Sequence, residues 1–253
     1  MKRFLVLCSI VGVASVLTAG GIRATDYLAA TDTICPADMV PVDAVPDVLC
    51  VDAFEARATE ACLHTVPDSP QATKGNLAIS TCIASGDGAD LPWRYIAREE
   101  AALLCARSGK RLPTAAEWYA LALPTSLTDC NFDAPGPVVK TNTTCRTPQG
   151  VAQMPGNVWE WVSDDIFDAA YRGRILPPSG YISSVDSDGV ATVTSTTSDE
   201  AFGADYARIA DLGVHGIVRG GFYGSGEDGG IYALQANIAP TFASAGIGFR
   251  CVR

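Results

Sequence analysis

The sequence predicts an α+β fold with a high content of coil. Three observations lead to this expectation. Only two helices are recognisable, the strand-forming runs are short and broken by Pro and Asp, and the cysteine count suits a fold held by disulfides. With 253 residues, 48% of them hydrophobic, the chain can build a real core in one large domain or two small ones.

Composition excludes several classes of function. The net charge of −10 argues against a nucleic-acid partner, because an acidic surface repels phosphate. The high apolar content argues against intrinsic disorder. Two histidines are too few for a multi-histidine metal centre.

Residues 1–24 have the layout of an export signal. Lys2 and Arg3 precede an apolar run that ends in small residues near Ala19. We expect cleavage between Ala19 and Ala24, and hence a periplasmic or extracellular protein. The alternative is a retained segment that anchors the chain in a membrane. Removing this segment takes away one of nine cysteines, and the remaining eight suit four disulfides in an oxidising compartment.

The chain continues with a polar lead-in over residues 25–35, followed by the predicted domain over 36–253. Short apolar runs predict strands over 39–42 and 48–51. The next segment, 62–92, is rich in Ser, Gly, Asp and Pro, and we predict a long loop there.

The first helix is predicted over 97–107. Glu99 and Glu100 lie in its first turn and Arg107 in its last, so these charges oppose the helix dipole favourably. Gly109 suits a left-handed exit from the helix.

The second helix is predicted to begin at Thr114, which forms a capping box with Glu117. Beyond it, residues 125–155 and 179–199 are expected to be loops. Residues 186–189 resemble a fragment of a calcium loop, but the distal Glu is missing, so a solvated loop is expected.

Two motifs also have simple physical interpretations. In an extended segment, Trp159 and Trp161 point to one side and Glu160 to the other. Arg250, between Phe249 and Cys251, is expected to be buried and therefore to need a carboxylate partner.

Three segments carry a resemblance to a known family. They read GKRLPTAAEW at 109–118, GNVWEWV at 156–162, and RGGFY at 219–223 with GFRC at 248–251. In this order and spacing they are similar to the sulfatase-modifying-factor family, whose founding activity is formylglycine generation. The resemblance extends over residues 36–253 and implies a C-type-lectin-related fold stapled by disulfides.

The resemblance also implies a structural calcium ion. Where the family commonly has Asp or Asn, this chain has Gln153, whose neutral and longer side chain favours weaker binding. A second family site would begin at Asn131 and Phe132. The ligands implied for the first site are the Gln153 amide, the Glu160 carboxylate and the carbonyls of Gly156 and Val158.

Copper is not expected. Formylglycine-generating relatives hold copper(I) with two cysteines that follow the Arg-Gly-Gly segment, and Ser225 and Gly230 stand at those positions here. A soft ion requires sulfur, which neither residue supplies. The stretch 224–230 contains no thiol or imidazole.

Family analogy also pairs Cys105 with Cys251. Cys130 and Cys145 flank a short loop and suit each other. The other four cysteines allow three pairings, of which Cys35–Cys50 with Cys62–Cys82 is the simplest.

Two functions compete. The first is an exported binding or structural module without formylglycine-generating activity, whose surface near 219–240 and 179–199 binds a protein, glycan or small molecule. Its former catalytic pocket should then be filled by Phe222 and its neighbours.

The alternative is an oxidoreductase-type enzyme, similar to an exported branch of this fold associated with siderophore maturation. Its pocket should bring Glu227, a tyrosine and an arginine together. The candidate acid, base or ligand residues are Tyr223, Glu227, Asp228 and Tyr232.

Overall fold

A computed structural model describes residues 34–43, 45–139 and 141–253. This part of the chain forms one unit from Ile34 to Arg253. The predicted export signal and most of the lead-in lie outside the described residues. In the described ranges, no helix is both long enough and apolar enough to cross a membrane.

Short strands dominate the described part of the chain, as expected from the sequence. Their bounds are β1 Met39–Pro41, β2 Cys50–Asp52, β3 Arg57–Ala58, β4 Ala84–Ser85, β5 Trp159–Phe167, β6 Ala170–Tyr171, β7 Arg174–Ile175, β8 Gly180–Val185, β9 Ala191–Ser195, β10 Tyr206–Ile209, β11 Val214–Arg219, β12 Leu234–Ile238 and β13 Ile247–Gly248.

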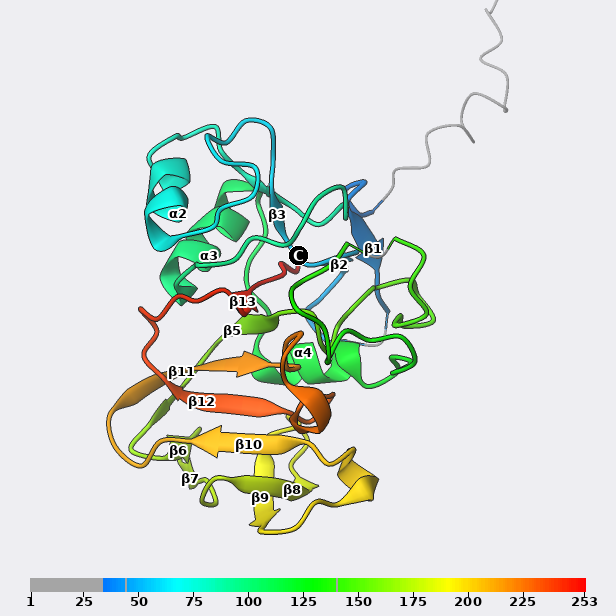
Figure 1. The fold of residues 1–253 in the computed structure, drawn as a ribbon, viewed down its shortest axis with the longest axis vertical. Coiled ribbons are helices and arrows are strands. Elements are labelled where there is room, and N and C mark those ends of the chain that lie inside the picture. The colour runs from blue at the N-terminus through cyan, green and yellow to red at the C-terminus, as the bar shows by residue number, and fades with distance from the viewer. Residues whose placement is uncertain (1–33, 44, 140) are drawn as a thin grey trace, which may run out of the picture. The chain divides into compact units, whose positions relative to one another are not determined.

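One nine-stranded sheet organises this unit (Figure 1). Its strands follow the order β7-β6-β5-β11-β12-β10-β8-β9, and β13 pairs with β5 outside this path. Most neighbours are antiparallel, whereas β10 with β12 and β13 with β5 are parallel. The pairs β1–β2 and β3–β4 form two separate small sheets.

The two faces of the sheet pack on separate hydrophobic cores. The first core contains helix α4 (Ala115–Ala122), and the second contains helix α3 (Arg98–Arg107). Trp159 and Trp161 both belong to the second core, whereas Glu160 points to the opposite side and bonds Trp118 of the first core. The predicted alternation along this strand is confirmed.

Both predicted helices are confirmed with their end signals. Gly109 follows α3 with φ +67°, the left-handed exit that was expected. At α4, the Thr114 Oγ1 atom accepts from the Glu117 backbone N at 3.1 Å, and the Glu117 carboxylate accepts from the Thr114 N at 2.8 Å. The capping box therefore satisfies donors that the helix itself leaves unpaired.

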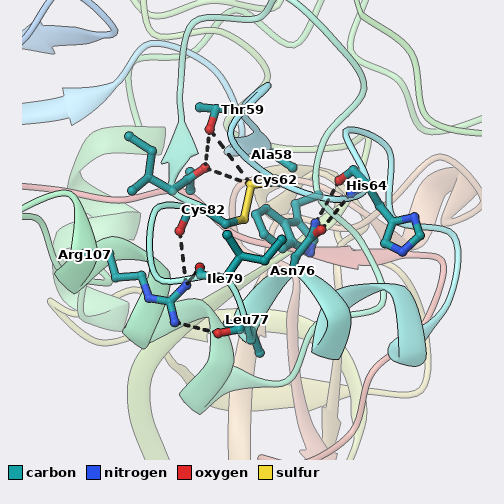
Figure 2. The surroundings of a disulfide bond; sticks show 12 residues. Ala58, Thr59, Cys62, His64, Asn76, Leu77, Ile79, Cys82 and Arg107 are labelled. Atoms are coloured by element: carbon teal, nitrogen blue, oxygen red, sulfur yellow. Dashed lines mark hydrogen bonds between the residues drawn. A yellow bond between two sulfur atoms is a disulfide. The ribbon is translucent and has the colours of Figure 1, made fainter.

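The prediction of a long loop over 62–92 is wrong. Helix α2 (Pro70–Leu77) forms within it, because Ser69 caps its start by accepting from the Ala72 N at 3.2 Å, and Pro70 occupies the first position. Figure 2 shows Arg107 donating to the carbonyls of Leu77 and two later residues, which holds the end of α2 against α3.

The expected loop over 179–199 is also mostly regular. Strands β8 and β9 form an antiparallel hairpin there with two register shifts in its pairing, and the turn and residues 196–199 remain irregular. The Asp186 carboxylate closes this turn by accepting from the backbone N atoms of Asp188 and Val190, each at 2.9 Å. Residues 125–155, by contrast, contain no helix or strand among those the structure describes.

Every cysteine in the described ranges is in a disulfide, and all four pairs are those expected. Cys105–Cys251 joins α3 to the segment after β13 across a sequence separation of 146, the longest of the four loops. A disulfide that closes a longer loop removes more conformational entropy from the unfolded chain. At this loop length the resulting stabilisation of the folded state is about 5 kcal/mol in an unstrained bond. Figure 2 shows the Cys62–Cys82 disulfide, which closes the segment that contains α2. The other two pairs are Cys35–Cys50 and Cys130–Cys145.

The carboxylate partner of Arg250 is Glu160. Both side chains are fully buried. The Arg250 Nε atom donates to both Glu160 oxygens at 2.8 Å, and Nη2 donates to Oε1 at 2.6 Å. The remaining guanidinium hydrogens bond the backbone carbonyls of Asp52, Ala152 and Gln153. This one arginine therefore ties four chain segments together.

Glu55 is a second buried carboxylate in this region, and no cation among the described residues forms an ion pair with it. It accepts from Asn157 Nδ2 at 2.7 Å and from the Val158 N at 3.3 Å. Burial, and then the charge of Glu160, raise the pKa of Glu55 to about 8, although Arg250 and the two donors act in the opposite direction.

Replacing Arg250→Met should cost about 3–5 kcal/mol of unfolding free energy, because Glu160 stays buried without its cation. Urea unfolding with the disulfides intact measures this loss. The double variant with Glu160→Gln no longer contains the unpaired buried carboxylate, so it should regain part of the lost unfolding free energy. The control is Arg253→Met, at an exposed side chain. A loss at Arg250 as small as that at Arg253 would contradict the assigned role.

The raised pKa of Glu55 also predicts a pH dependence. The folded state holds this proton between about pH 4.5 and about pH 8, where the unfolded chain has lost it. Stability should therefore be complete below this range and fall as the pH rises through it. In Glu55→Gln, the slope of the unfolding free energy against pH should be less steep by up to about 1.4 kcal/mol per pH unit. Unfolding curves at a series of pH values test this, and parallel curves for both proteins would refute it.

Candidate functional site

The second core covers only part of one face of the sheet. It covers this face where β5, β11 and α3 meet, but among the described residues it takes none from β8 or β10. These strands lie at the far end of the sheet from α2 and α3 (Figure 1). Their outward side chains therefore form a partly exposed platform.

The platform carries aromatic and polar side chains. On β10, Tyr206 and Arg208 alternate with residues buried in the first core, so both point outward. Tyr206 lies opposite Tyr181 of β8, and Arg208 lies opposite Gln235 of β12. The two tyrosine rings pack edge to face with centroids 5.1 Å apart, and the Arg208 guanidinium lies 5.0 Å from the Tyr206 ring centre.

A glycine-rich loop borders this platform. Gly220 and Gly221 have φ values of +95° and +85°, which L side chains rarely adopt. A Cβ atom on Gly220 would lie 2.8 Å from a ring carbon of Trp118. These two glycines allow the chain to leave β11 against a buried indole.

Ser225 shapes the next part of the loop. Its Oγ atom accepts from the Phe222 backbone N at 2.9 Å, and a single 3-10 turn, η2 (Gly226–Asp228), follows. The Gly226 N donates to the Phe132 carbonyl at 2.9 Å, which fixes the turn to the loop over 125–155.

A pocket of about 210 Å³ lies where the loop meets the platform. The Arg208 Nη2 atom donates to the Asp228 Oδ2 atom at 2.7 Å, and both side chains are about one third exposed. We call this cavity the Arg208 pocket. Its lining residues are Trp159, Arg208, Phe222, Gly224, Ser225, Asp228 and Gln235.

The structure gathers only part of the predicted acid–base set. Asp228 lines the Arg208 pocket, whereas Glu227 is exposed outside it. Tyr223 packs its ring on Phe222 with centroids 5.0 Å apart. Tyr232 instead packs with two rings beside the first core, so neither tyrosine lines the pocket.

The two positions at which the resemblance implies cysteines in relatives, Ser225 and Gly230, differ in what surrounds them. Ser225 lines the pocket, but Gly230 is buried against Asp205, and a Cβ atom there would overlap the Asp205 carboxylate. That carboxylate accepts from the backbone N atoms of Tyr232 at 2.6 Å and Ala233 at 3.1 Å. Burial raises the pKa of Asp205 to about 7, against the lowering effect of these bonds.

Arg219 holds the loop and the β8–β9 hairpin together. Its guanidinium is fully buried and donates to the carbonyls of Gly189 at 2.8 Å and Ile231 at 3.2 Å. It also lies over the rings of Trp118 and Tyr119. Burial lowers the pKa of Arg219 to about 10. This residue explains why segments distant in sequence share one site.

The residues of the implied calcium sites lie close together. The Asn157 N donates to the Asn131 carbonyl at 2.7 Å, and a Cβ atom on Gly156 would contact both Asn131 and Phe132. Gln153 is buried, and its Nε2 atom has no hydrogen-bond partner among the described residues. The described residues contain no group of three or more His, Cys, Asp or Glu that could hold a metal ion.

The Glu160 carboxylate fits calcium poorly. Its oxygens already accept from Arg250 and, at 2.6 Å, from the Trp118 Nε1 atom. An ion bound there would have to share this carboxylate with a guanidinium. The unpartnered Gln153 Nε2 atom does not favour an ion, because it is a hydrogen-bond donor; only the Oε1 atom of this amide could be a calcium ligand. A shared carboxylate, a neutral amide oxygen and backbone carbonyls would form only a weak calcium site.

The platform residues were not anticipated from the sequence. The alternation in Tyr206-Ala207-Arg208-Ile209 does indicate a strand with one polar face. It does not reveal that Tyr181 and Gln235 lie beside it, because the order of strands in the sheet is not readable from local patterns.

Several solved structures are similar to this chain. The chain has 19% identity to the Major Tropism Determinant P3c variant (TM-score 0.45), over 87% of this chain and 53% of that one, so it spans about half that protein's length. It has 15% identity to CarF (TM-score 0.43), and the match covers 81% of this chain and 85% of that one. It has 18% identity to PvdO from Pseudomonas aeruginosa (TM-score 0.41), and the match covers 64% of this chain and 62% of that one. No curated protein matches the sequence. The model of the sulfatase-modifying factor enzyme 1-like domain matches residues 119–253, more than half of the chain, and the chain therefore belongs to this family.

Proposed function

We propose that this chain is an exported binding module of its family and does not generate formylglycine. The observation that carries the proposal is the surroundings of Gly230, where the Asp205 carboxylate occupies the space that a cysteine side chain would need. Ser225 supplies only a hydroxyl at the other position. All eight cysteines of the described ranges are in disulfides, so none offers a thiol in its place.

Export is part of the proposal. Four disulfides are typical of an oxidising compartment. The predicted signal over 1–24 would deliver the chain to the periplasm or the cell exterior, with membrane attachment if the signal is retained.

The Arg208 pocket favours binding over catalysis. Its two ionic groups neutralise each other, and its lining contains no thiol, imidazole or phenol. The binding hypothesis expects Phe222 and its neighbours to fill this pocket, whereas Phe222 lines it and about 210 Å³ stays open. Glu227 and the candidate tyrosines of the oxidoreductase alternative lie outside its lining. The platform beside it joins the two segments expected to bind a partner, because β10 pairs with both β8 and β12.

We expect the purified, oxidised protein to leave a sulfatase-derived cysteine peptide unchanged in the presence of copper and oxygen, as followed by mass spectrometry. Thiol titration after unfolding should find no free thiol in the signal-free chain before reduction and eight after it. Conversion of the peptide, or two or more free thiols in the native protein, would overturn the proposal.

We also propose that calcium binds weakly beside Gln153. The available donors are one shared carboxylate, one neutral amide and two backbone carbonyls, which suits dissociation constants in the millimolar range, on the order of those of weak extracellular sites.

Calcium at about ten times such a dissociation constant should raise the melting temperature by roughly 2–4 °C. Gln153→Asp adds a charged oxygen ligand and should enlarge this calcium-dependent shift. Gln149→Asp makes the same change at an exposed position of the same loop and should not. Differential scanning fluorimetry with calcium and with a chelator measures the shifts. No calcium effect in either the native chain or Gln153→Asp would exclude the site.

A further inference from the structure

The Arg208 pocket has features that point to one chemical class of ligand. Its polar groups come mainly from Arg208, Asp228 and Gln235, and its apolar surface comes from the rings of Trp159 and Phe222. We propose that this pocket binds one ring of a neutral saccharide. The inference rests on the proposed binding function and names its ligand.

The charges in the pocket favour a ligand that is polar but uncharged. Arg208 and Asp228 neutralise each other, so neither ion is available to pair with an ionic ligand. The chain's net charge of −10 also disfavours anions. The guanidinium retains further donors, the carboxylate retains acceptor sites, and the Gln235 amide offers both. Vicinal hydroxyl groups match such planar donor and acceptor pairs.

The pocket's size also suits a single sugar ring. Pockets for drug-sized ligands usually measure about 300–1,000 Å³. The 210 Å³ found here accommodates a smaller ligand, of about a dozen non-hydrogen atoms. A pyranose has hydroxyls around its rim and C–H groups on its faces, and a C–H face can pack on the half-buried ring of Phe222, whereas Trp159, only 4% exposed, contributes little surface.

The platform provides room for more than one ring. Tyr206 and Tyr181 continue from Arg208 toward the edge of the sheet, and Ser195 of β9 lies opposite Tyr181. Partly exposed tyrosines offer an apolar ring and a polar hydroxyl together. A longer saccharide can therefore extend across β10 and β8.

A peptide is less well matched to this place. Extended peptides usually bind by adding a strand to a free sheet edge. The strand that carries Arg208 has no free edge, because β10 is paired with β12 on one side and with β8 on the other. Main-chain pairing is therefore blocked beside the pocket, and recognition must come from side chains.

The test uses the disulfide-bonded protein and methyl glycosides of glucose, galactose, mannose and N-acetylglucosamine. Isothermal titration and amide chemical-shift mapping should find at least one that binds saturably, with a millimolar dissociation constant typical of a ligand this small. The shifted amides should include those of Ser225 and Gln235.

Asp228→Asn leaves Arg208 without its partner and makes the pocket positive. It should weaken the neutral glycoside at least tenfold and strengthen methyl glucuronide relative to it. Glu227→Gln removes the same charge from the neighbouring exposed residue and should change neither affinity. Melting temperatures confirm that both variants fold.

The saccharide inference is overturned if none of the glycosides binds at tens of millimolar, or if both variants weaken binding equally. A displayed peptide that binds this platform and is lost in Asp228→Asn, with no glycoside bound, would overturn the saccharide inference alone. The proposed binding function would then stand.

Discussion

The buried pair of Glu160 and Arg250 is the interaction on which the rest of the structure depends. Two charges without water are tolerated only with close geometry and further hydrogen bonds, and here every guanidinium nitrogen has an acceptor. Through these bonds β5, β2, the segment before β5 and the segment after β13 meet at one point. The next residue, Cys251, adds a covalent link to α3. Ionic and covalent constraints thus hold the centre of a fold that has little helix to support it.

The candidate site inherits its geometry from that centre. Glu160 lies opposite Arg219 in the pairing of β5 with β11, so the buried pair also positions the start of the glycine-rich loop. Arg219 then reaches the β8–β9 hairpin and Ile231 by two hydrogen bonds to carbonyls. The Arg208 pocket is therefore built from segments that touch only because β5, β11 and β10 belong to one sheet. A pocket assembled in this way can change its lining residues while the supporting bonds remain.

Local chemistry made much of the fold predictable, and long-range geometry accounts for what was missed. The Thr114–Glu117 box, the alternation of Trp159 and Trp161, and the need of Arg250 for a carboxylate all depend on neighbours in sequence or on the cost of burial. Helix α2 was missed because its apolar face is weak, although the Ser69-Pro70 start was visible. The hairpin over 180–195 was missed because Ser and Thr suit loops and exposed strands equally. The partners of Arg208 depend on strand order, which no local pattern contains.

The pattern of disulfides sets a requirement for the maturation of this chain. Three disulfides join cysteines that are consecutive in sequence. The fourth joins Cys105 to Cys251, and both Cys130 and Cys145 lie between these two in the sequence. In the proposed export, which begins at the N-terminus, the next cysteine to arrive after Cys105 is Cys130. An oxidant that joins thiols in order of arrival would form that incorrect bond, which must then be exchanged through a mixed-disulfide intermediate. Oxidation in that order would therefore require disulfide exchange as well as disulfide formation.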